Sequence, residues 1–499
     1  MVLRKNGWAG FGEIGELSSV TTANITGWLA FMLPFVLYLL TLAPTIYNLD
    51  SAELTTAAAT GGIIRATGYP LYLILGGLWS KLPIGDVGYR MNLMSAVAGA
   101  VTLLLAERSL YRLHVGSWAR LGAIGLLATA PYFWTLSLIA EVYTLHTALM
   151  AGIILALLVW RDNPAPWRLG LAVFLTAVSL GNHMATVLLV PGCVLFVLVV
   201  GKGDVLRPRN ILSALISLLL GLSIYLYLPW LHSTHPAFNY AGTFNAQGAF
   251  EPVNLQTWQG FWWLVSGKAF AGQMGGYTLV ELWGELLHFG EQLWQAFFAL
   301  GIGPALLGFV IFWRRDKATN LLLLVMFVTN VLFYASYRVI DKDTMFLPAY
   351  LIWALWLGLG YDALSHWLND EGARRTTWAI RTVMVGVVVM ALVWNWHQVD
   401  QSNDWSTRQR SEEILSLVEP NAIVLGWWDT VPGVQYLQLV EGQRPDVLAI
   451  NRFLISGDDM AQLIAENAAQ RPIYINNPPV EFLRTLHVEP VGSLYRLYP

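Results

Sequence analysis

The chain consists largely of long apolar runs, each about 18–22 residues, separated by short charged clusters. A helix of that length crosses a hydrocarbon core of about 30 Å, because an α-helix rises about 1.5 Å per residue. In lipid, backbone polar groups must be hydrogen-bonded inside a helix or a closed barrel. The runs lack the alternation that is typical of barrel strands. We therefore predict a polytopic α-helical membrane protein.

The number and placement of these runs predict about eleven transmembrane helices. Only 12% of the residues are charged, about half the share that is usual in a soluble domain. The fifth and sixth runs are separated only by Asn182 and His183, so they could form two short helices or one broken helix. The predicted spans are 27–46, 91–111, 119–137, 142–160, 167–181, 184–200, 210–230, 288–313, 320–337, 345–365 and 377–396.

Lysine and arginine are concentrated in one alternate set of short loops, and such loops usually face the cytoplasm. We therefore predict a cytoplasmic N-terminal segment at 1–26 and a transmembrane domain at 27–396. Its long outward loops are 47–90 and 231–287, and a soluble outward-facing domain follows at 397–499. The net charge of -3, without a polybasic surface, indicates membrane lipid rather than nucleic acid as a partner. The basic residues behind this assignment are Arg4, Lys5, Arg108, Arg112, Arg120, Arg161, Arg168, Lys202, Arg207, Arg209, Arg314, Arg315, Lys317, Arg374 and Arg375.

The chain changes character in its last hundred or so residues, where charged positions become frequent. Helical and strand patterns alternate there, which is typical of a small α/β domain. The segment contains neither a P-loop nor a GxGxxG motif. The predicted helices are 411–418, 434–440 and 460–469, and the predicted strands are 422–425, 447–451 and 473–475.

The first predicted outward loop carries two carboxylates three residues apart, Asp50 and Glu53. On a helix they would share one face. An aspartate at the N-cap with a glutamate three residues later is also a variant of the capping box, so the pair predicts a helix start. The two interpretations are compatible, because the helix dipole stabilises an ionised carboxylate at the N-terminus. Such a carboxylate suits a base that activates an acceptor hydroxyl.

Four other polar residues lie at predicted outward ends of the spans. Glu141 joins the third and fourth runs, where an acidic residue is costly and often functional, although it could be an interfacial anchor. His183 could be a packing residue, or it could be a cation in a functional site. Arg338 and Lys342 belong to a charged turn that could be merely solvated or could hold an anionic head group. The sequence has no HExxH, CxxC pair or GxSxG, and gives no basis for a metal site.

Several short motifs lie in order along nearly the whole chain. They are Leu42-Ala43-Pro44-Thr45, Asp50-Ser51-Ala52-Glu53, Gly68-Tyr69-Pro70-Leu71-Tyr72, Tyr89-Arg90-Met91-Asn92-Leu93-Met94-Ser95-Ala96, Glu141-Val142-Tyr143, Ser179-Leu180-Gly181-Asn182-His183, Phe346-Leu347-Pro348-Ala349-Tyr350, Glu419-Pro420-Asn421-Ala422-Ile423 and Gly442-Gln443-Arg444-Pro445-Asp446-Val447. As an ordered set they resemble a family of membrane proteins whose animal members are protein O-mannosyltransferases.

The resemblance implies the GT-C glycosyltransferase fold, a polyprenyl-phosphate-linked sugar as donor and an essential acid in the first outward loop. On that pattern Asp50 is the expected catalytic acid, with Glu53 beside it. Family members often have Gly-Asp-Ser-Gly-Glu at this place, and both acids are kept here. The family's His-Pro-Pro-Gly-Tyr-Pro is replaced by 66–70, which lacks the histidine. We expect the donor or acceptor to be bound by Glu141, His183, Arg338, Lys342 and Tyr69.

These observations predict a membrane glycosyltransferase that moves a sugar to an acceptor hydroxyl on the outer face, in a protein serine or threonine or in a glycan. No cofactor is implied beyond the lipid-linked sugar, which is a substrate. A transporter or lipid flippase without transferase chemistry is the alternative, and it predicts polar residues in mid-span and internal symmetry. A non-catalytic membrane subunit that uses its tail for docking is a third possibility.

Overall fold

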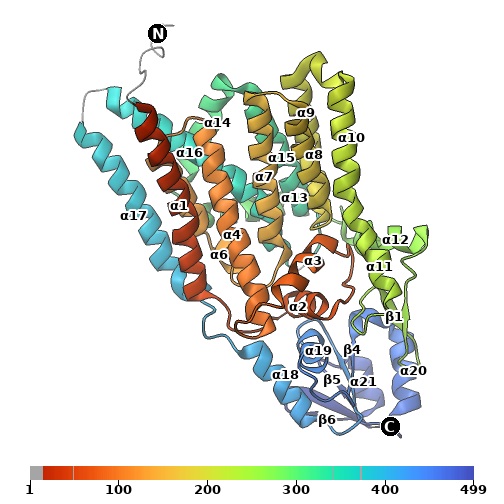
Figure 1. Ribbon diagram of the computed structural model, residues 1–499. Helices are drawn as coiled ribbons and strands as arrows, with labels where there is room; N and C mark the ends of the chain where they lie inside the picture. The colour runs from red at the N-terminus through yellow and green to blue at the C-terminus, as the bar shows by residue number, and fades with distance from the viewer. Residues whose placement is uncertain (1–14, 49, 340, 371–373, 499) are drawn as a thin grey trace.

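A computed structural model of the chain describes residues 15–48, 50–339, 341–370 and 374–498. The first part of the predicted N-terminal segment, with Arg4 and Lys5, lies outside the described residues, as does Leu49 of the first acidic motif. The helices form an elongated bundle. The N-terminal end and the C-terminal domain lie at opposite ends of it (Figure 1).

Long apolar helices form most of the bundle, as the sequence predicts. In the described part of the chain, eight helical segments are long and apolar enough to cross a membrane. They comprise α1 (Gly15–Thr41), α4 (Val87–Arg112), α7 (Val142–Asp162), α9 (Val190–Gly201) with the 3-10 turns that flank it, α10 (Pro208–Leu222) continuing into α11 (Tyr227–Ser233), α15 (Lys317–Ala335), α16 (Leu347–Asp370) and α17 (Arg374–Val399).

Three of the predicted spans are short or broken helices, so the expected number is reduced. The run 119–137 is divided between α5 (Ser117–Ala128) and α6 (Pro131–Leu136), because the residue before a proline is driven out of the helical region. The run 288–313 is divided between α13 (Leu279–Ala296) and α14 (Ile302–Arg315). The run 167–181 is α8 (Pro166–Leu180), with 15 residues.

The arginine-rich loops meet at one end of the bundle. Arg112 pairs with Asp162 at 3.0 Å, and Arg161 pairs with Asp316 at 2.6 Å. Loops that are distant in sequence therefore share one side, as the charge pattern predicts, and the C-terminal domain lies beyond the opposite end (Figure 1). That the arginine-rich end faces the cytoplasm stays a prediction.

The predicted outward loops are folded. The loop 47–90 contains α2 (Asp50–Thr60) and α3 (Pro70–Trp79), which lie where the bundle meets the C-terminal domain (Figure 1). The loop 231–287 contains the hairpin of β1 (Gly242–Phe244) and β2 (Phe250–Pro252), then α12 (Trp258–Val265) and the start of α13.

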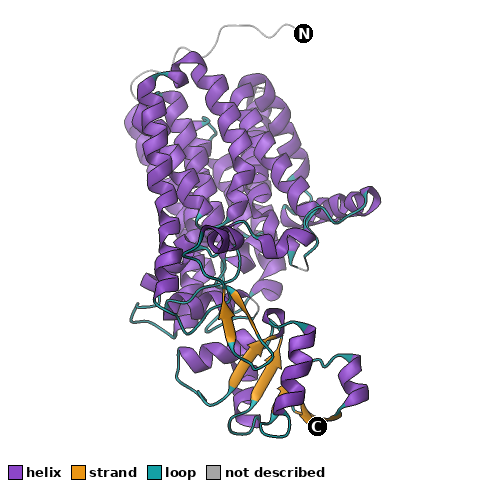
Figure 2. Cartoon of the chain, turned by 90° about the vertical axis from the view of Figure 1, so that its right-hand side faces the viewer, coloured by secondary structure: helices purple, strands orange, loops and turns teal. Residues whose placement is uncertain are grey.

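The C-terminal domain is an α/β domain, and all six of its predicted elements are present. Its sheet has the strand order β4-β3-β5-β7-β6, in which β3 is parallel to β4 and β5, and β7 is antiparallel to β5 and β6. Figure 2 shows this sheet below the helical bundle. The elements are α18 (Ser406–Leu417), β3 (Ile423–Gly426), α19 (Val431–Leu439), β4 (Leu448–Asn451), α20 (Gly457–Asn467), β5 (Ile473–Ile475), α21 (Val480–Thr485), β6 (His487–Val491) and β7 (Leu494–Tyr498).

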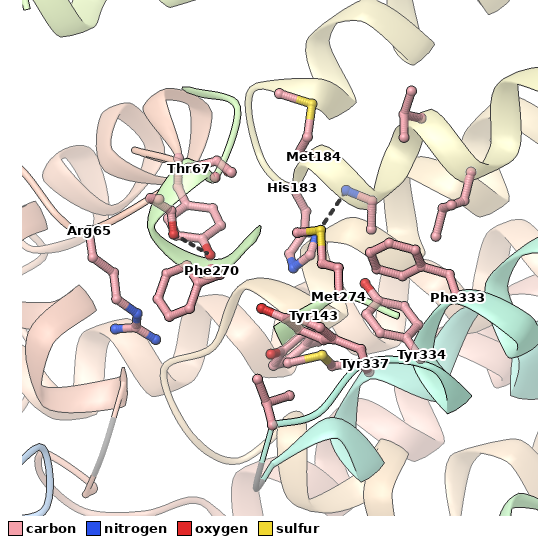
Figure 3. A pocket seen from close by; sticks show the side chains of 18 of the residues that line it. Arg65, Thr67, Tyr143, His183, Met184, Phe270, Met274, Phe333, Tyr334 and Tyr337 are labelled. Carbon is pink, nitrogen blue, oxygen red and sulfur yellow. Dashed lines mark hydrogen bonds between the residues drawn. The ribbon is translucent and has the colours of Figure 1, made fainter. Parts of the chain in front are cut away.

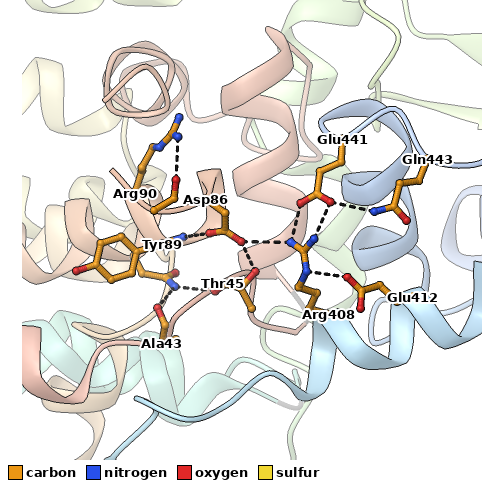
Figure 4. Close-up of polar contacts among 11 residues, drawn as sticks. Ala43, Thr45, Asp86, Tyr89, Arg90, Arg408, Glu412, Glu441 and Gln443 are labelled. Atoms are coloured by element: carbon orange, nitrogen blue, oxygen red, sulfur yellow. Dashed lines mark hydrogen bonds and ion pairs between the residues drawn. The ribbon is translucent and has the colours of Figure 1, made fainter. Parts of the chain in front are cut away.

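The C-terminal domain is packed firmly against the first loop of the bundle. Ala52 of α2 is buried in the same hydrophobic cluster as Val431 of α19. Arg408 of α18 contacts Glu441 at 2.6 Å and Asp86 at 3.4 Å (Figure 4). Because Asp86 also caps α4, this ion pair ties α18 to the start of a membrane helix.

The predicted orientation can be tested with two single cysteines in a Cys193→Ser background. Ala465 is exposed on the C-terminal domain, and Gly203 is exposed in a loop at the other end of the bundle, with room for a side chain. A membrane-impermeant maleimide should label Ala465→Cys in intact cells, and should label Gly203→Cys only after permeabilisation. The reverse pattern would overturn the orientation.

Candidate functional site

A cavity of about 310 Å³ lies at the end of the bundle nearest the C-terminal domain. Aromatic and apolar side chains form most of its wall, and a few polar groups converge on it, which is typical of a small-molecule site. Figure 3 shows Arg65 at one end, Phe333 and Tyr334 at the other, and His183 between them. The wall also includes Asp50, Tyr69, Tyr143, Phe270, Met274, Tyr337 and Asp341.

The first loop folds back so that Arg65 reaches both predicted acids. Asp50 opens α2, and Glu53 lies one turn later. The chain then turns at Gly62, where a Cβ atom would come within 2.8 Å of the Phe238 carbonyl oxygen, so only glycine fits this close approach. The Arg65 guanidinium donates to Asp50 Oδ2 and to Glu53 Oε2. One cation therefore holds the carboxylate pair.

Glu53 is the buried member of the pair. Its side chain has 0% exposure, against 21% for Asp50. The Arg65 backbone N–H donates to Glu53 Oε1 at 3.2 Å, and the indole Nε1–H of Trp428 donates to Oε2 at 2.7 Å. Burial raises the pKa of Glu53, while Arg65 and, to a smaller extent, Trp428 oppose the rise. These contacts replace the capping-box role that the sequence allowed for Glu53.

His183 lies in the cavity wall inside a cluster of rings. Tyr143, Tyr69 and His146 surround it at ring-centroid distances of 5.7, 5.9 and 5.3 Å. Its Nδ1 accepts the Ala185 backbone N–H at 3.1 Å, so the neutral ring carries its proton on Nε2. Burial lowers the pKa of His183 to about 4. The ring therefore acts as a neutral hydrogen-bond donor at pH 7, not as the cation that the sequence suggested.

Two further carboxyl groups lie near Asp50. Asp341 lines the cavity, and burial, followed by the negative charge of Asp50, raises its pKa. Glu141 is 8% exposed, and its Oε2 atom is buried without a hydrogen-bond partner. Burial raises the pKa of Glu141 well above its ordinary value, and Asp50 and Asp341 add to the rise. The site is therefore richer in acids than in cations.

Arg338 and Lys342 are held by other partners outside this cavity. Arg338 pairs with Glu281 at 2.8 Å, and Lys342 pairs with Glu285 at 2.5 Å, so both cations are matched by acids of α13. Neither side chain is among those that line the cavity in the described part of the chain. Their predicted contact with an anionic head group stays a prediction.

Sequence reasoning missed two residues of the site. Arg65 could have been suspected, because a buried acid pair needs a counter-charge and this arginine lies in the same loop, between apolar neighbours. Nothing in the sequence points to Trp428 as a site residue, because it lies 375 residues from Glu53 in the chain. Tyr69, which the sequence did single out, lines the cavity, and its role in binding stays a prediction.

The acids do not assemble into a metal site in the described residues. In that part of the chain, no group of three or more histidine, cysteine, aspartate or glutamate side chains is arranged to hold a metal ion.

Comparison with known sequences identifies relatives. Residues 50–205 match the family model of the protein O-mannosyl-transferase TMEM260 N-terminal domain. The chain is 24% identical over 474 residues to protein O-mannosyl-transferase tmem260 of Dictyostelium discoideum, and 25% identical over 454 residues to TMEM260 of Mus musculus. These alignments cover 86% and 84% of this chain but 57% and 61% of the relatives. The chain thus spans about three fifths of the length of these relatives.

Comparison with solved structures identifies the fold. Crystal structures of ArnT from Cupriavidus metallidurans, one bound to undecaprenyl phosphate and one in the apo state, each match with a TM-score of 0.58. The first covers 97% of this chain and 98% of ArnT at 9% sequence identity. The GT-C-like fold and the resemblance to the O-mannosyltransferase family are both confirmed by these matches.

The buried ion-pair cluster predicts a stability effect. Arg65→Met leaves Glu53 buried without its cation, and losing one partner of such a pair costs about 3–5 kcal/mol. We expect a clearly lower Tm for Arg65→Met in thermal melts, with part of the loss restored in Arg65→Met/Glu53→Gln. Arg410→Met is the control, because its partner Asp429 is more than a third exposed. Equal melting of Arg65→Met and wild type would contradict the structural role of the pair.

Proposed function

Since residues 50–205 match the family model of the TMEM260 protein O-mannosyl-transferase N-terminal domain and the fold is GT-C-like, we propose that this chain is a membrane glycosyltransferase. The donor is a sugar linked to a polyprenyl phosphate, and the acceptor is a hydroxyl group, of a protein serine or threonine in the first instance. Relatives named protein O-mannosyl-transferases support the acceptor class, and ArnT bound to undecaprenyl phosphate supports the donor class. The observation that carries the proposal is the Asp50 carboxylate, held by Arg65 at the cavity wall.

Asp50 acts as the general base. Arg65 engages its Oδ2 atom, so Oδ1 remains for the acceptor hydroxyl. As the acceptor oxygen attacks the anomeric carbon, its proton moves to Asp50. The bond between that carbon and the phosphate oxygen breaks, and its electron pair leaves with the lipid phosphate. The partial exposure of Asp50 fits this contact role, whereas the buried Glu53 fits a role in positioning Arg65.

Neutral donors in the cavity wall receive the leaving phosphate. The Nε2–H group of His183 and the phenol groups of Tyr69 and Tyr143 belong to one ring cluster that lines the cavity. Preorganised donors of this kind stabilise charge that develops in a transition state. Asp341, which lines the cavity, is better suited to sugar hydroxyls, which donate hydrogen bonds to carboxyl oxygens.

A transporter or flippase is not favoured by the arrangement of polar groups. That alternative predicts ionisable residues in mid-span. Here the acids of the site, Asp50, Glu53, Glu141 and Asp341, lie in α2 and in segments that join helices. A non-catalytic subunit is not favoured either, because the structure has a cavity lined by the charged side chains of Asp50 and Arg65.

The direct test is an assay of the purified protein with a panel of polyprenyl-phosphate sugars and serine- or threonine-containing peptides. Mass spectrometry should detect a hexose-sized increase on a peptide, with mannose as the first sugar to examine. Absence of transfer from every donor in the panel to any acceptor would contradict the proposal.

Replacement of Asp50 by asparagine separates catalysis from a structural contact with Arg65. Asparagine keeps the shape of the side chain, and its amide oxygen can still accept a hydrogen bond from Arg65, so a purely structural Asp50 should lose much less activity than a general base. Loss of a general base reduces the rate by about 10²–10⁴-fold. We expect a loss of that size in kcat for Asp50→Asn, and near wild-type kcat for Asp343→Asn, whose side chain pairs with His288 outside the cavity. A folded Asp50→Asn protein with full activity would rule out this base.

A further inference from the structure

One contact joins the C-terminal domain to the acid pair. The Trp428 indole N–H donates to Glu53 Oε2 at 2.7 Å, and the same ring lies 4.8 Å from the Arg65 guanidinium carbon. Tyr240 and Phe453 pack edge-on against it, with ring-centroid distances of 5.9 and 4.7 Å. Trp428 is therefore held on several sides while it touches both charged partners of the site.

Trp428 is placed at the edge of the α/β sheet where such domains usually bind ligands. It follows β3 directly, on the side where the parallel strands β3, β4 and β5 have their carboxyl ends. The chain runs from β3 to β4 on one side and later returns to β5 on the other, which makes this edge a topological switch point. In this protein, Trp428 at this edge contacts Glu53 of α2 in the membrane domain.

The loop that carries Trp428 is fixed by hydrogen bonds within the C-terminal domain. Asn476, which follows β5, accepts the Trp427 backbone N–H at 3.2 Å and donates to Thr430 at 2.7 Å. Arg452, which follows β4, donates to the Asn476 carbonyl oxygen at 2.9 Å. The loops after all three parallel strands are thus hydrogen-bonded to one another. These bonds fix the position of the loop that carries Trp428.

The domain also reaches the wall of the cavity. Phe453 stacks on Phe270, which lines the cavity, at a centroid distance of 5.9 Å. On the other side of Trp428, the Tyr240 hydroxyl donates to Gln435 of α19 at 2.6 Å. The C-terminal domain is therefore in contact with the cavity wall, with the acid pair and with the loop that packs around them.

We propose that the C-terminal α/β domain is part of the active site and that Trp428 is a positioning residue, which holds Glu53 so that Arg65 and Asp50 keep their places. The proposal rests on the transferase function proposed above. In this proposal, Trp428 does not touch any reacting atom of the substrates. It acts through Glu53, then Arg65, then Asp50.

The physical basis is the buried charge of Glu53. The titratable and charged groups that face Glu53 are Asp50, Arg65, Tyr69 and Tyr240. Removing the indole N–H removes one donor to the ionised carboxylate, so the pKa of Glu53 rises further. A protonated Glu53 loses its charge-assisted bond to Arg65, which is then free to shift away from Asp50.

The test uses the full-length protein with Trp428→Phe, which keeps an aromatic ring but removes the N–H group. Trp427→Phe is the matched control, because Trp427 stacks on Arg452 instead of the acids. We expect Trp428→Phe to move the acidic limb of the kcat profile upward by about one pH unit, with KM nearly unchanged. Trp427→Phe should keep the wild-type profile, and equal Tm values would confirm that both variants are folded. An unshifted, fully active Trp428→Phe profile would overturn the proposal.

A second measurement does not depend on transferase activity. Infrared titration can follow the carboxyl band of Glu53, assigned by its absence in Glu53→Gln. In Trp428→Phe this band should persist to higher pH than in wild type, and identical titrations would overturn the positioning role. If the band shifts but wild type transfers no sugar, the transferase proposal fails while the Trp428–Glu53 contact is upheld.

Discussion

The arrangement of this molecule depends on one buried negative charge. Glu53 has no exposed side-chain surface, and an ionised carboxylate in such a place is unfavourable unless it is paired and hydrogen-bonded. Three groups meet that need: the Arg65 guanidinium, the Arg65 backbone N–H and the Trp428 indole. The partners of this one buried glutamate therefore come from both the folded-back first loop and the C-terminal domain.

Much of the fold can be predicted from the sequence, because the constraints involved are local. The length of an apolar run sets its ability to cross a bilayer, and the alternation of short apolar segments predicts the α/β domain. The Asp50–Glu53 pair predicts the start of α2, because the signal for a helix start also depends only on residues that are close in the sequence. The failures are also physical. Breaks such as those at Pro131 and at 297–301 shorten helices inside runs whose composition alone looks continuous.

The site could be predicted only in part, because charge pairing is a property of the folded chain. Arg338 and Lys342 looked like free cations at the end of a span, yet Glu281 and Glu285 of α13 neutralise them. His183 looked like a potential cation, yet a closed ring cluster makes it neutral. Conversely, Arg65 is drawn into the site by two acids of its own loop. The sequence shows which polar residues the chain has. It does not show which residue each of them pairs with in the folded protein.

The position of Trp428 in the chain has a consequence for the biosynthesis of the protein. Ribosomes synthesise this residue only after all the described membrane helices. A nascent chain with its bundle already inserted still lacks the indole that completes the environment of Glu53. On the proposed function, such a chain would meet its lipid-linked donor in the bilayer before the C-terminal domain has folded. On the proposed positioning role, the pH dependence of transfer would therefore change when the C-terminal domain folds against α2 and the indole reaches Glu53.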